Sequence, residues 1–130
     1  MVHDWFISLS TMGMMRQKFP TPYSAIFGDY DGYVVIGKDH PYFNEGTNNI
    51  SVEIHGGLTY DSYGILCQLP ELKQEYATED YRIIGFNTAH SGDSIEKWTK
   101  ERTEKETCKL YGQLYMAYIK KKKDDNRTEC

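Results

Sequence analysis

The chain has 130 residues and a formal net charge of −4, which suits a single domain spanning 1–130 with one buried core. The acidic balance argues against nucleic-acid binding, because such binding needs a basic surface. No apolar run approaches the ~20 residues of a membrane span, and no secretory signal opens the chain. The three cysteines are widely spaced and form no zinc-type pair. We therefore expect a cytoplasmic protein with reduced thiols and no membrane contact.

In chain order, residues 3–18 are compatible with a short helix, although their apolar pattern is poor. Residues 32–37 have the β-branched content and glycine borders of a strand. Residues 50–55 alternate apolar and polar side chains strictly, which predicts a strand whose isoleucines and valine face the core. Further strands are predicted at 58–60, 64–69 and 81–87.

A long helix is predicted from about 94 to 120, because Asp93 is a good N-cap and Glu96 follows it at capping-box spacing. Its polar stretch 99–107 suggests a break or a projection into solvent there. The basic run 120–123 suits a helix C-terminus, and a charged tail is expected at 121–130. These elements predict an α+β fold, a mainly antiparallel sheet of four or five strands with the helix packed on it.

Three of the four histidines stand in short polar motifs beside a carboxylate: Asp39-His40, Glu53-Ile54-His55-Gly56-Gly57 and His90-Ser91-Gly92-Asp93. The last two motifs follow apolar, strand-like runs. Paired glycines and a helix start both present backbone N–H groups that could hold an anion. We therefore predict one pocket around a motif-bearing core at 31–93. Its predicted catalytic residues are His55, His90 and Glu53, and its predicted ligand-binding residues are His40, Gly56, Gly57, Tyr60, Asn87, Gly92 and Asp93.

Each motif also has a purely structural explanation. Gly56-Gly57 fits a hairpin turn, Asp93 fits a helix cap, and Asp39-His40-Pro41 fits an ordinary turn. A three-histidine zinc site would suit catalysis, but the tight spacings of zinc motifs are missing, so no metal ligands are assigned and the cofactor stays unknown. No serine elbow and no activated cysteine is found.

The same residues resemble a family of small phage and prophage proteins whose hallmark is HGGLTY followed by GFD-x-AH-x-GD. The matching segments cover roughly 31–93: Gly32-Tyr33-Val34, His40-Pro41, His55-Gly56-Gly57-Leu58-Thr59-Tyr60 and Ile84-Gly85-Phe86-Asn87-Thr88-Ala89-His90-Ser91-Gly92-Asp93. Asn87 replaces the usual Asp, which removes a charge and weakens any role there as metal ligand or base. The family has no settled activity. The resemblance implies a phage protein in a bacterial host cytoplasm, a setting where small proteins often counter host defence.

Two function classes follow. In one, the protein binds or hydrolyses a small anionic or nucleotide-type ligand, with His55 or His90 as acid/base and Glu53 orienting it. In the other, it is a non-enzymatic inhibitor that docks on a host defence protein, such as a CRISPR-type protein, through a tyrosine-rich acidic surface. The sequence favours the first class. It leaves the ligand, turnover and oligomeric state open.

Overall fold

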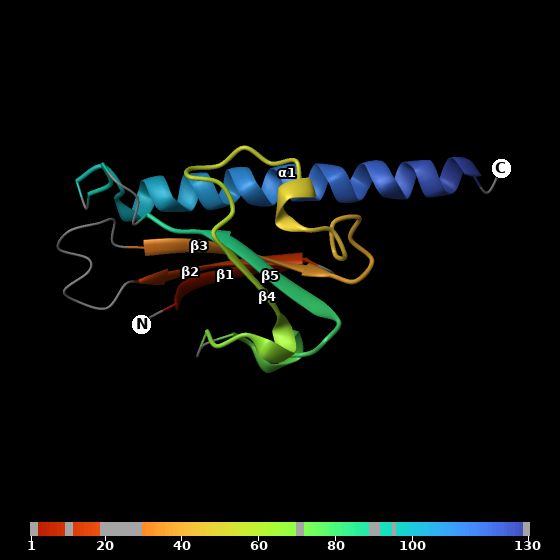
Figure 1. The fold of residues 1–130 in the computed structure, drawn as a ribbon, viewed down its shortest axis with the longest axis horizontal. Coiled ribbons are helices and arrows are strands. Elements are labelled where there is room, and N and C mark those ends of the chain that lie inside the picture. Colours follow the sequence, from red (N-terminus) through yellow and green to blue (C-terminus); the bar gives the residue numbers. More distant parts are fainter. Residues whose placement is uncertain are drawn as a thin grey trace.

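The computed structural model describes residues 3–9, 12–18, 30–69, 72–88, 92–94 and 96–128. The strands form one antiparallel sheet in the order β1-β2-β3-β5-β4, and α1 crosses one of its faces (Figure 1). The strands are β1 (His3–Leu9), β2 (Met12–Lys18), β3 (Tyr30–Gly37), β4 (Tyr60–Tyr63) and β5 (Tyr81–Phe86). The helices are η2 (Thr47–Asn49), η3 (Gly64–Leu66), η4 (Gln74–Tyr76) and α1 (Lys100–Thr128). The expected α+β class, with an antiparallel sheet and a long C-terminal helix, is confirmed.

Strand β3 lies at the centre of the sheet, between β2 and β5. Val34, Val35 and Ile36 are fully buried, so both faces of this strand are covered. Side chains alternate between the two faces of a strand, and two apolar clusters result. The cluster under α1 includes Val34, Ile36, Ile84, Phe86, Trp98, Leu110 and Leu114. The cluster on the opposite face includes Tyr33, Val35, Tyr76 and Ile83.

Helix α1 comes closest to the sheet at Gly32, where a Cβ atom would lie 2.0 Å from the Thr107 hydroxyl. Only glycine leaves room for this approach. Thr103 and Thr107 are fully buried, and their hydroxyls donate to the carbonyls of Thr99 and Thr103, respectively. Because these hydroxyls are satisfied by backbone carbonyls, Thr103 and Thr107 can pack against the sheet, while Lys100, Arg102 and Lys105 of the same stretch are exposed. The expected break there was wrong.

The N-terminal prediction of a helix was also wrong, because residues 3–9 and 12–18 form β1 and β2. Strand β2 pairs with β3 from Met12↔Ile36 to Lys18↔Tyr30. The buried β3 needs hydrogen-bond partners along both of its edges, and β2 supplies one edge. The predicted strand at 64–69 is replaced by η3 and irregular chain.

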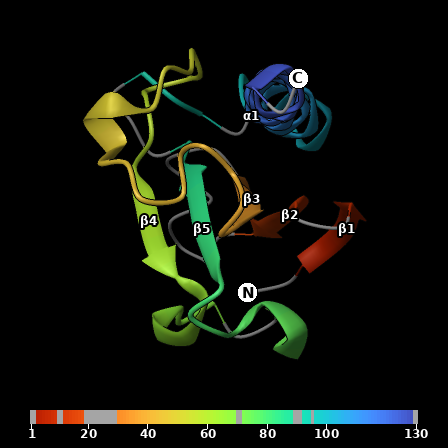
Figure 2. The ribbon, with the colours of Figure 1, turned by 90° about the vertical axis from the view of Figure 1, so that its right-hand side faces the viewer.

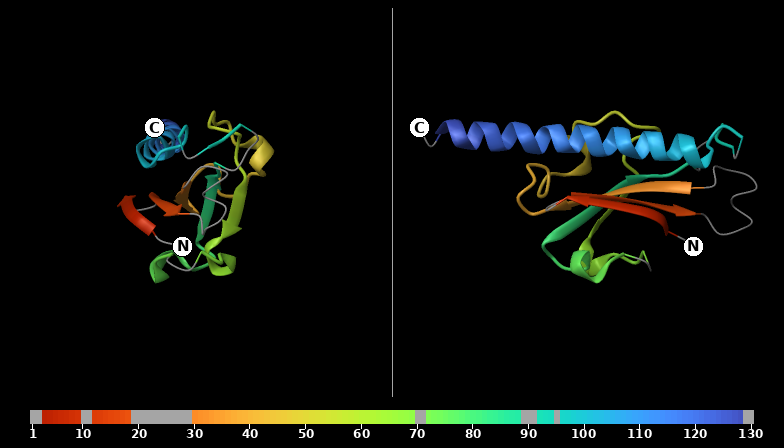
Figure 3. Two further views of the ribbon diagram at one scale, coloured as in Figure 1. Left: turned by 90° about the vertical axis from the view of Figure 1, so that its left-hand side faces the viewer. Right: turned by 180° about the vertical axis from the view of Figure 1, so that it is seen from behind.

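Helix α1 starts later and ends later than predicted, since it runs from Lys100 to Thr128. Thr99 caps it: the Thr99 hydroxyl accepts a hydrogen bond from the Arg102 N–H at 3.2 Å, the usual N-cap contact. Asp93 therefore does not cap α1. Most of the expected tail 121–130 is helical, and the last turns extend past the sheet (Figures 1 and 3).

Residues 50–55 are not a strand, although their alternation predicted correctly which side chains face inward. Ile50 is buried, and Val52 and Ile54 pack on the cluster under α1. Helix side chains, not a neighbouring strand, satisfy the backbone: the Glu53 N–H donates to Gln113 Oε1 at 2.7 Å. The segment belongs to a loop, residues 38–59, which links β3 to β4 and runs beside α1 (Figure 2).

Candidate functional site

Besides the contacts between Glu53 and Gln113, two groups of side chains hold the 38–59 loop in place, each centred on a histidine. We name them the His55 cluster (His55, Asp93, Trp98, Arg102 and Glu106) and the His40 cluster (His40, Tyr42, Arg82, Leu114 and Tyr118). The contacts to Glu106 and to Leu114 lie eight positions apart on α1, roughly 12 Å along its axis. The single pocket predicted around both histidines is therefore divided into two separate groups.

In the His55 cluster, His55 Nε2 bonds both carboxylate oxygens of Asp93, at 2.9 and 3.0 Å. The Asp93 side chain is only 5% exposed, whereas that of His55 is 25% exposed. The His55 backbone N–H donates to Glu106 Oε2 at 2.6 Å. Asp93, and not the predicted Glu53, is thus the carboxylate that orients His55.

An aromatic and cationic stack supports this histidine. The His55 and Trp98 ring centroids are 4.2 Å apart, and the Arg102 guanidinium lies 4.2 Å from the Trp98 ring centroid. Trp98 is 3% exposed. The indole is therefore used in packing His55 and Arg102, and it leaves little surface for a ligand.

At the centre of the His40 cluster, the histidine ring is buried and both of its nitrogens form hydrogen bonds. His40 is 2% exposed, and its Nε2 lies 2.8 Å from the Leu114 carbonyl oxygen. The Tyr42 N–H donates to His40 Nδ1 at 3.0 Å, which makes Nε2 the protonated nitrogen of a neutral ring. Burial lowers the pKa of His40 below 6.5, although the bond to Leu114 and the charge of Asp39 oppose this. His40 therefore connects loop and helix and has no ring nitrogen left for a ligand.

Arg82 completes the His40 cluster from strand β5. Its guanidinium donates to Asp61 through Nε and Nη2, at 2.7 and 2.9 Å. Nη1 donates to the backbone carbonyls of Tyr42, Phe43 and Glu45. Sequence reasoning missed this residue, although a charged side chain inside the apolar run YRIIGF needs a partner. Arg82 fixes the loop next to His40.

The other predicted residues are dispersed. His90 lies outside the described residues. Glu53 is exposed, and it contacts α1 through its backbone: Gln113 Nε2 donates to the Glu53 carbonyl at 3.0 Å. Gly56, Gly57 and Gly92 are exposed and have positive φ angles of 68°, 76° and 90°. Gly57 N–H bonds the Ile54 carbonyl at 3.1 Å, so the glycine pair closes a turn. Asn87 is half-buried just after β5.

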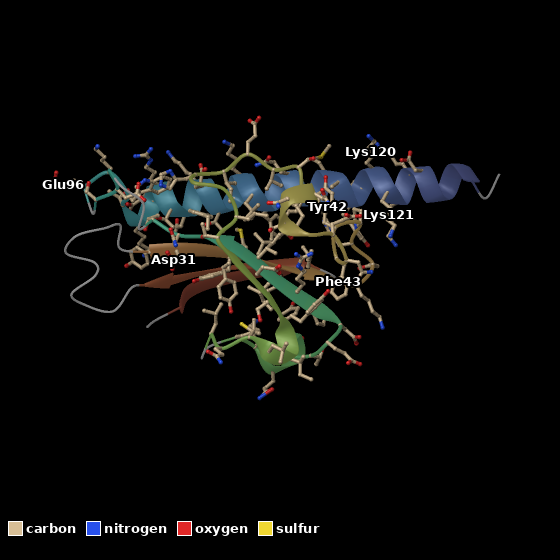
Figure 4. All side chains as sticks on the ribbon, viewed as in Figure 1. Asp31, Tyr42, Phe43, Glu96, Lys120 and Lys121 are labelled. Atoms are coloured by element: carbon tan, nitrogen blue, oxygen red, sulfur yellow. The ribbon has the colours of Figure 1, made fainter. Side chains whose placement is uncertain are left out.

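Tyr60 lies on the sheet face opposite α1, in a second group of titratable side chains with Asp31, Tyr33 and Cys67. The Tyr33 hydroxyl donates to Asp31 at 3.1 Å, and the Tyr60 hydroxyl lies 3.3 Å from the Cys67 sulfur. Burial raises the pKa of Asp31 to about 7 and, with Cys67, raises the pKa of Tyr60 to about 12. Figure 4 shows Asp31 and Tyr42 toward opposite ends of the sheet.

Hollows on the surface lie elsewhere. Two grooves of about 440 and 410 Å³ flank Tyr42 along the last third of α1, and both are lined by Tyr42, Ala117 and Lys120. A smaller hollow of about 260 Å³ lies between Lys38 and Asp80. None of these three is lined by His40, His55 or Asp93.

Among the described side chains, no group of three or more His, Cys, Asp or Glu is placed to hold a metal ion. Within the same part of the chain, no helix combines the length and apolar character needed to cross a membrane. Comparison of the chain with protein-family models, with curated proteins and with solved structures gives no match.

Proposed function

We propose that the protein acts by binding another protein, without turnover, through the face of α1 beside Tyr42. The observation that carries this proposal is how the polar groups are used. His40 bonds the helix and its own loop through both ring nitrogens. His55 and Asp93 bond each other beside the Trp98 ring. The His40 ring thus holds the 38–59 loop on α1, and the His55 ring fixes the same loop to the segment that precedes α1.

The loop and the helix together form a platform suited to docking. Phe43 is buried against the Tyr63 ring, with centroids 5.5 Å apart, and Arg82 holds the backbone on both sides of it. Tyr42, which follows the fixed His40, therefore has a defined position. An interface on a rigid element loses little entropy when a partner binds. The grooves at Tyr42 lie on this platform.

The docking surface differs from the tyrosine-rich acidic one suggested by the sequence. Of the tyrosines whose side chains are described, only Tyr63 is exposed. The grooves beside α1 carry lysines instead. In the phage setting implied by the HGGLTY and GFN-x-AH-x-GD motifs, the partner would be a host defence protein in the bacterial cytoplasm, CRISPR-type proteins included.

Affinity purification from the bacterial host would test this proposal with two matched variants. Met116→Glu combined with Lys120→Glu changes the groove at exposed positions, whereas His55→Ala changes the other cluster. We expect the groove variant to lose a partner that the wild-type protein and His55→Ala both retain. Retention of the partner by the groove variant would contradict the proposal, and loss by His55→Ala alone would move the docking site to the His55 cluster.

A second candidate, binding or hydrolysis of a small anionic ligand, is favoured by one observation: His55 is a quarter exposed while the carboxylate that orients it is buried. A buried carboxylate on an accessible imidazole is the arrangement that a general base uses. Mass spectrometry of small molecules released by denaturing protein purified from nucleotide-fed cells tests this candidate. A ligand present with the wild-type protein and absent with His55→Gln would favour it over docking.

A further inference from the structure

Resting on the proposed function, we infer the chemistry of the partner: the groove at Tyr42 takes an acidic peptide segment that carries an apolar side chain. The apolar residue would enter between Tyr42 and α1, and its flanking carboxylates would meet the lysines of the helix. Contacts, exposure and charge at this end of α1 each support one part of this inference.

The inferred apolar side chain of the partner is supported by the residues that line the larger groove. Tyr42, Met116, Ala117 and Ile119 supply its apolar walls, and Met116 is 65% exposed. A volume of about 440 Å³ falls in the range of sites that enclose small ligands and side chains. Exposed methionine adapts to different apolar partners. One large aliphatic or aromatic side chain would therefore fit here.

The charged part rests on four consecutive lysines, Lys120–Lys123, in a chain of net charge −4. Lys121 donates to the Asp39 carbonyl at 3.3 Å, and Lys122 lies over the Tyr118 ring at 5.4 Å. Lys120 and Lys123 line the larger groove and form no ion pair within the described part of the chain. These two ammonium groups are therefore available for the carboxylates of a partner (Figure 4 labels Lys120 and Lys121).

A peptide fits this surface better than a nucleic acid does. Asp124 lines the second groove beside Lys120 and Lys121 and interrupts the row of lysines, so this surface can match a few carboxylates but not a continuous phosphate backbone. The net charge of −4 opposes the approach of a long polyanion. Base stacking needs exposed aromatic faces, but Lys122 already covers the Tyr118 ring. The lysines therefore suit a few carboxylates around one apolar anchor.

Titration with labelled synthetic peptides tests the inference by fluorescence anisotropy. The probe peptide places leucines at i, i+4 spacing among glutamates, and two control peptides replace its glutamates by glutamine or its leucines by serine. The protein is used as wild type, as Lys120→Gln with Lys123→Gln, and as Lys100→Gln with Lys105→Gln. The last variant removes two exposed lysines of α1 away from the groove.

We expect saturable binding of the acidic leucine peptide, weaker binding of both control peptides, and further weakening as salt rises. The groove variant should lose on the order of tenfold in affinity, while the Lys100/Lys105 variant should bind like the wild type. Equal binding of the glutamine peptide, or equal loss in both lysine variants, would overturn the inference. So would preferential binding of oligothymidylate, or a self-association in sedimentation that Met116→Glu abolishes, since a different occupant would then fill the groove.

The two levels of the proposal fail separately. If no acidic peptide binds, yet the groove variant still loses its partner in affinity purification, the inferred chemistry is wrong and docking at α1 stands. If the groove variant keeps its partner there, docking at this face is wrong, whatever the peptides do.

Discussion

The His40 and His55 clusters use the same residue type, on the same loop, against the same helix, but they differ in their access to water. His40 is 2% exposed, and both of its ring nitrogens bond backbone atoms. The His55 side chain is 25% exposed and faces a carboxylate. The comparison shows that a histidine in a polar motif can be either a buried connector or a partly exposed hydrogen-bond partner of a carboxylate, and that burial decides which.

The difference has an energetic consequence. A hydrogen bond at the surface is exchanged for one with water when it breaks, whereas a buried group that loses its partner bears the full cost of desolvation. We therefore expect substitutions of the buried His40 and Arg82 to act strongly on folding, and substitution of the partly exposed His55 to act more weakly.

The largest effect is expected for Arg82→Leu in the His40 cluster. The substitution removes the donor for three loop carbonyls and leaves Asp61 unpaired. Each buried or half-buried acceptor left without its donor costs about 1–3 kcal/mol, so the loss of three carbonyl contacts should give the largest destabilisation, which urea denaturation would measure. Asp61→Asn is the control: it keeps an oxygen that can accept from the guanidinium and leaves the three loop carbonyl contacts of Arg82 in place, so it should cost less. Equal losses for the two variants would contradict a buried role for Arg82.

His40→Ala should be the next most damaging change. It leaves the Tyr42 N–H and the Leu114 carbonyl without the ring that now bonds both, at a cost of about 1–3 kcal/mol. Tyr118→Phe, which removes only a hydroxyl bond to Asp39, serves as a milder change at the same cluster. Hydrogen exchange should show faster opening of residues 39–45 in His40→Ala. Unchanged hydrogen exchange at residues 39–45 would show that His40 does not hold this loop in place.

The pH dependence of stability sharpens the same contrast. The pKa of His40 in the folded protein is lowered below 6.5. Just below pH 6.5 the ring is therefore protonated in the unfolded chain but still neutral in the folded protein. Stability should therefore fall as pH falls through this range, and His40→Asn should lose that dependence. Denaturation from about pH 7 to about pH 5 measures the difference between the two proteins. Asp31, whose pKa is raised from 3.8 to about 7, makes stability rise as pH falls between these two values. Its contribution is the same in both proteins and cancels in their difference. A stability difference that does not change with pH would therefore count against His40.

The sequence predicted the central strands well because their patterns are local. Val34-Val35-Ile36 and Ile83-Ile84 are apolar on both faces, as buried strands require, and β3 and β5 contain them. It failed at 50–55 because alternation reports which side chains are buried, not what bonds the backbone. There Gln113 and Glu106 of α1 replace a neighbouring strand, and no local pattern shows contacts over such a separation.

The candidate site was harder to predict for a related reason. Asp93 has the composition of a helix cap, yet its carboxylate bonds His55, 38 positions earlier in the chain, and Thr99 caps the helix instead. The sequence indicated that His55 and Asp93 share a site, and the structure brings them together. The sequence prediction also placed His40 in this site. That grouping failed because the spacing of residues along the chain does not show which positions of α1 His40 and His55 will contact.

The smallest effect is expected in the His55 cluster, and a double-mutant cycle measures it. His55→Ala and Asp93→Ala each remove one side of a bond of 2.9 Å, and their coupling should be about 1 kcal/mol, since directly bonded residues are coupled while distant ones are not. Combining His55→Ala with His40→Ala should give nearly additive losses, because the two clusters contact α1 two turns apart. Coupling between the two histidines as large as that between His55 and Asp93 would show one cooperative unit, and the separation into a buried connector and a partly exposed histidine–carboxylate pair would then be wrong.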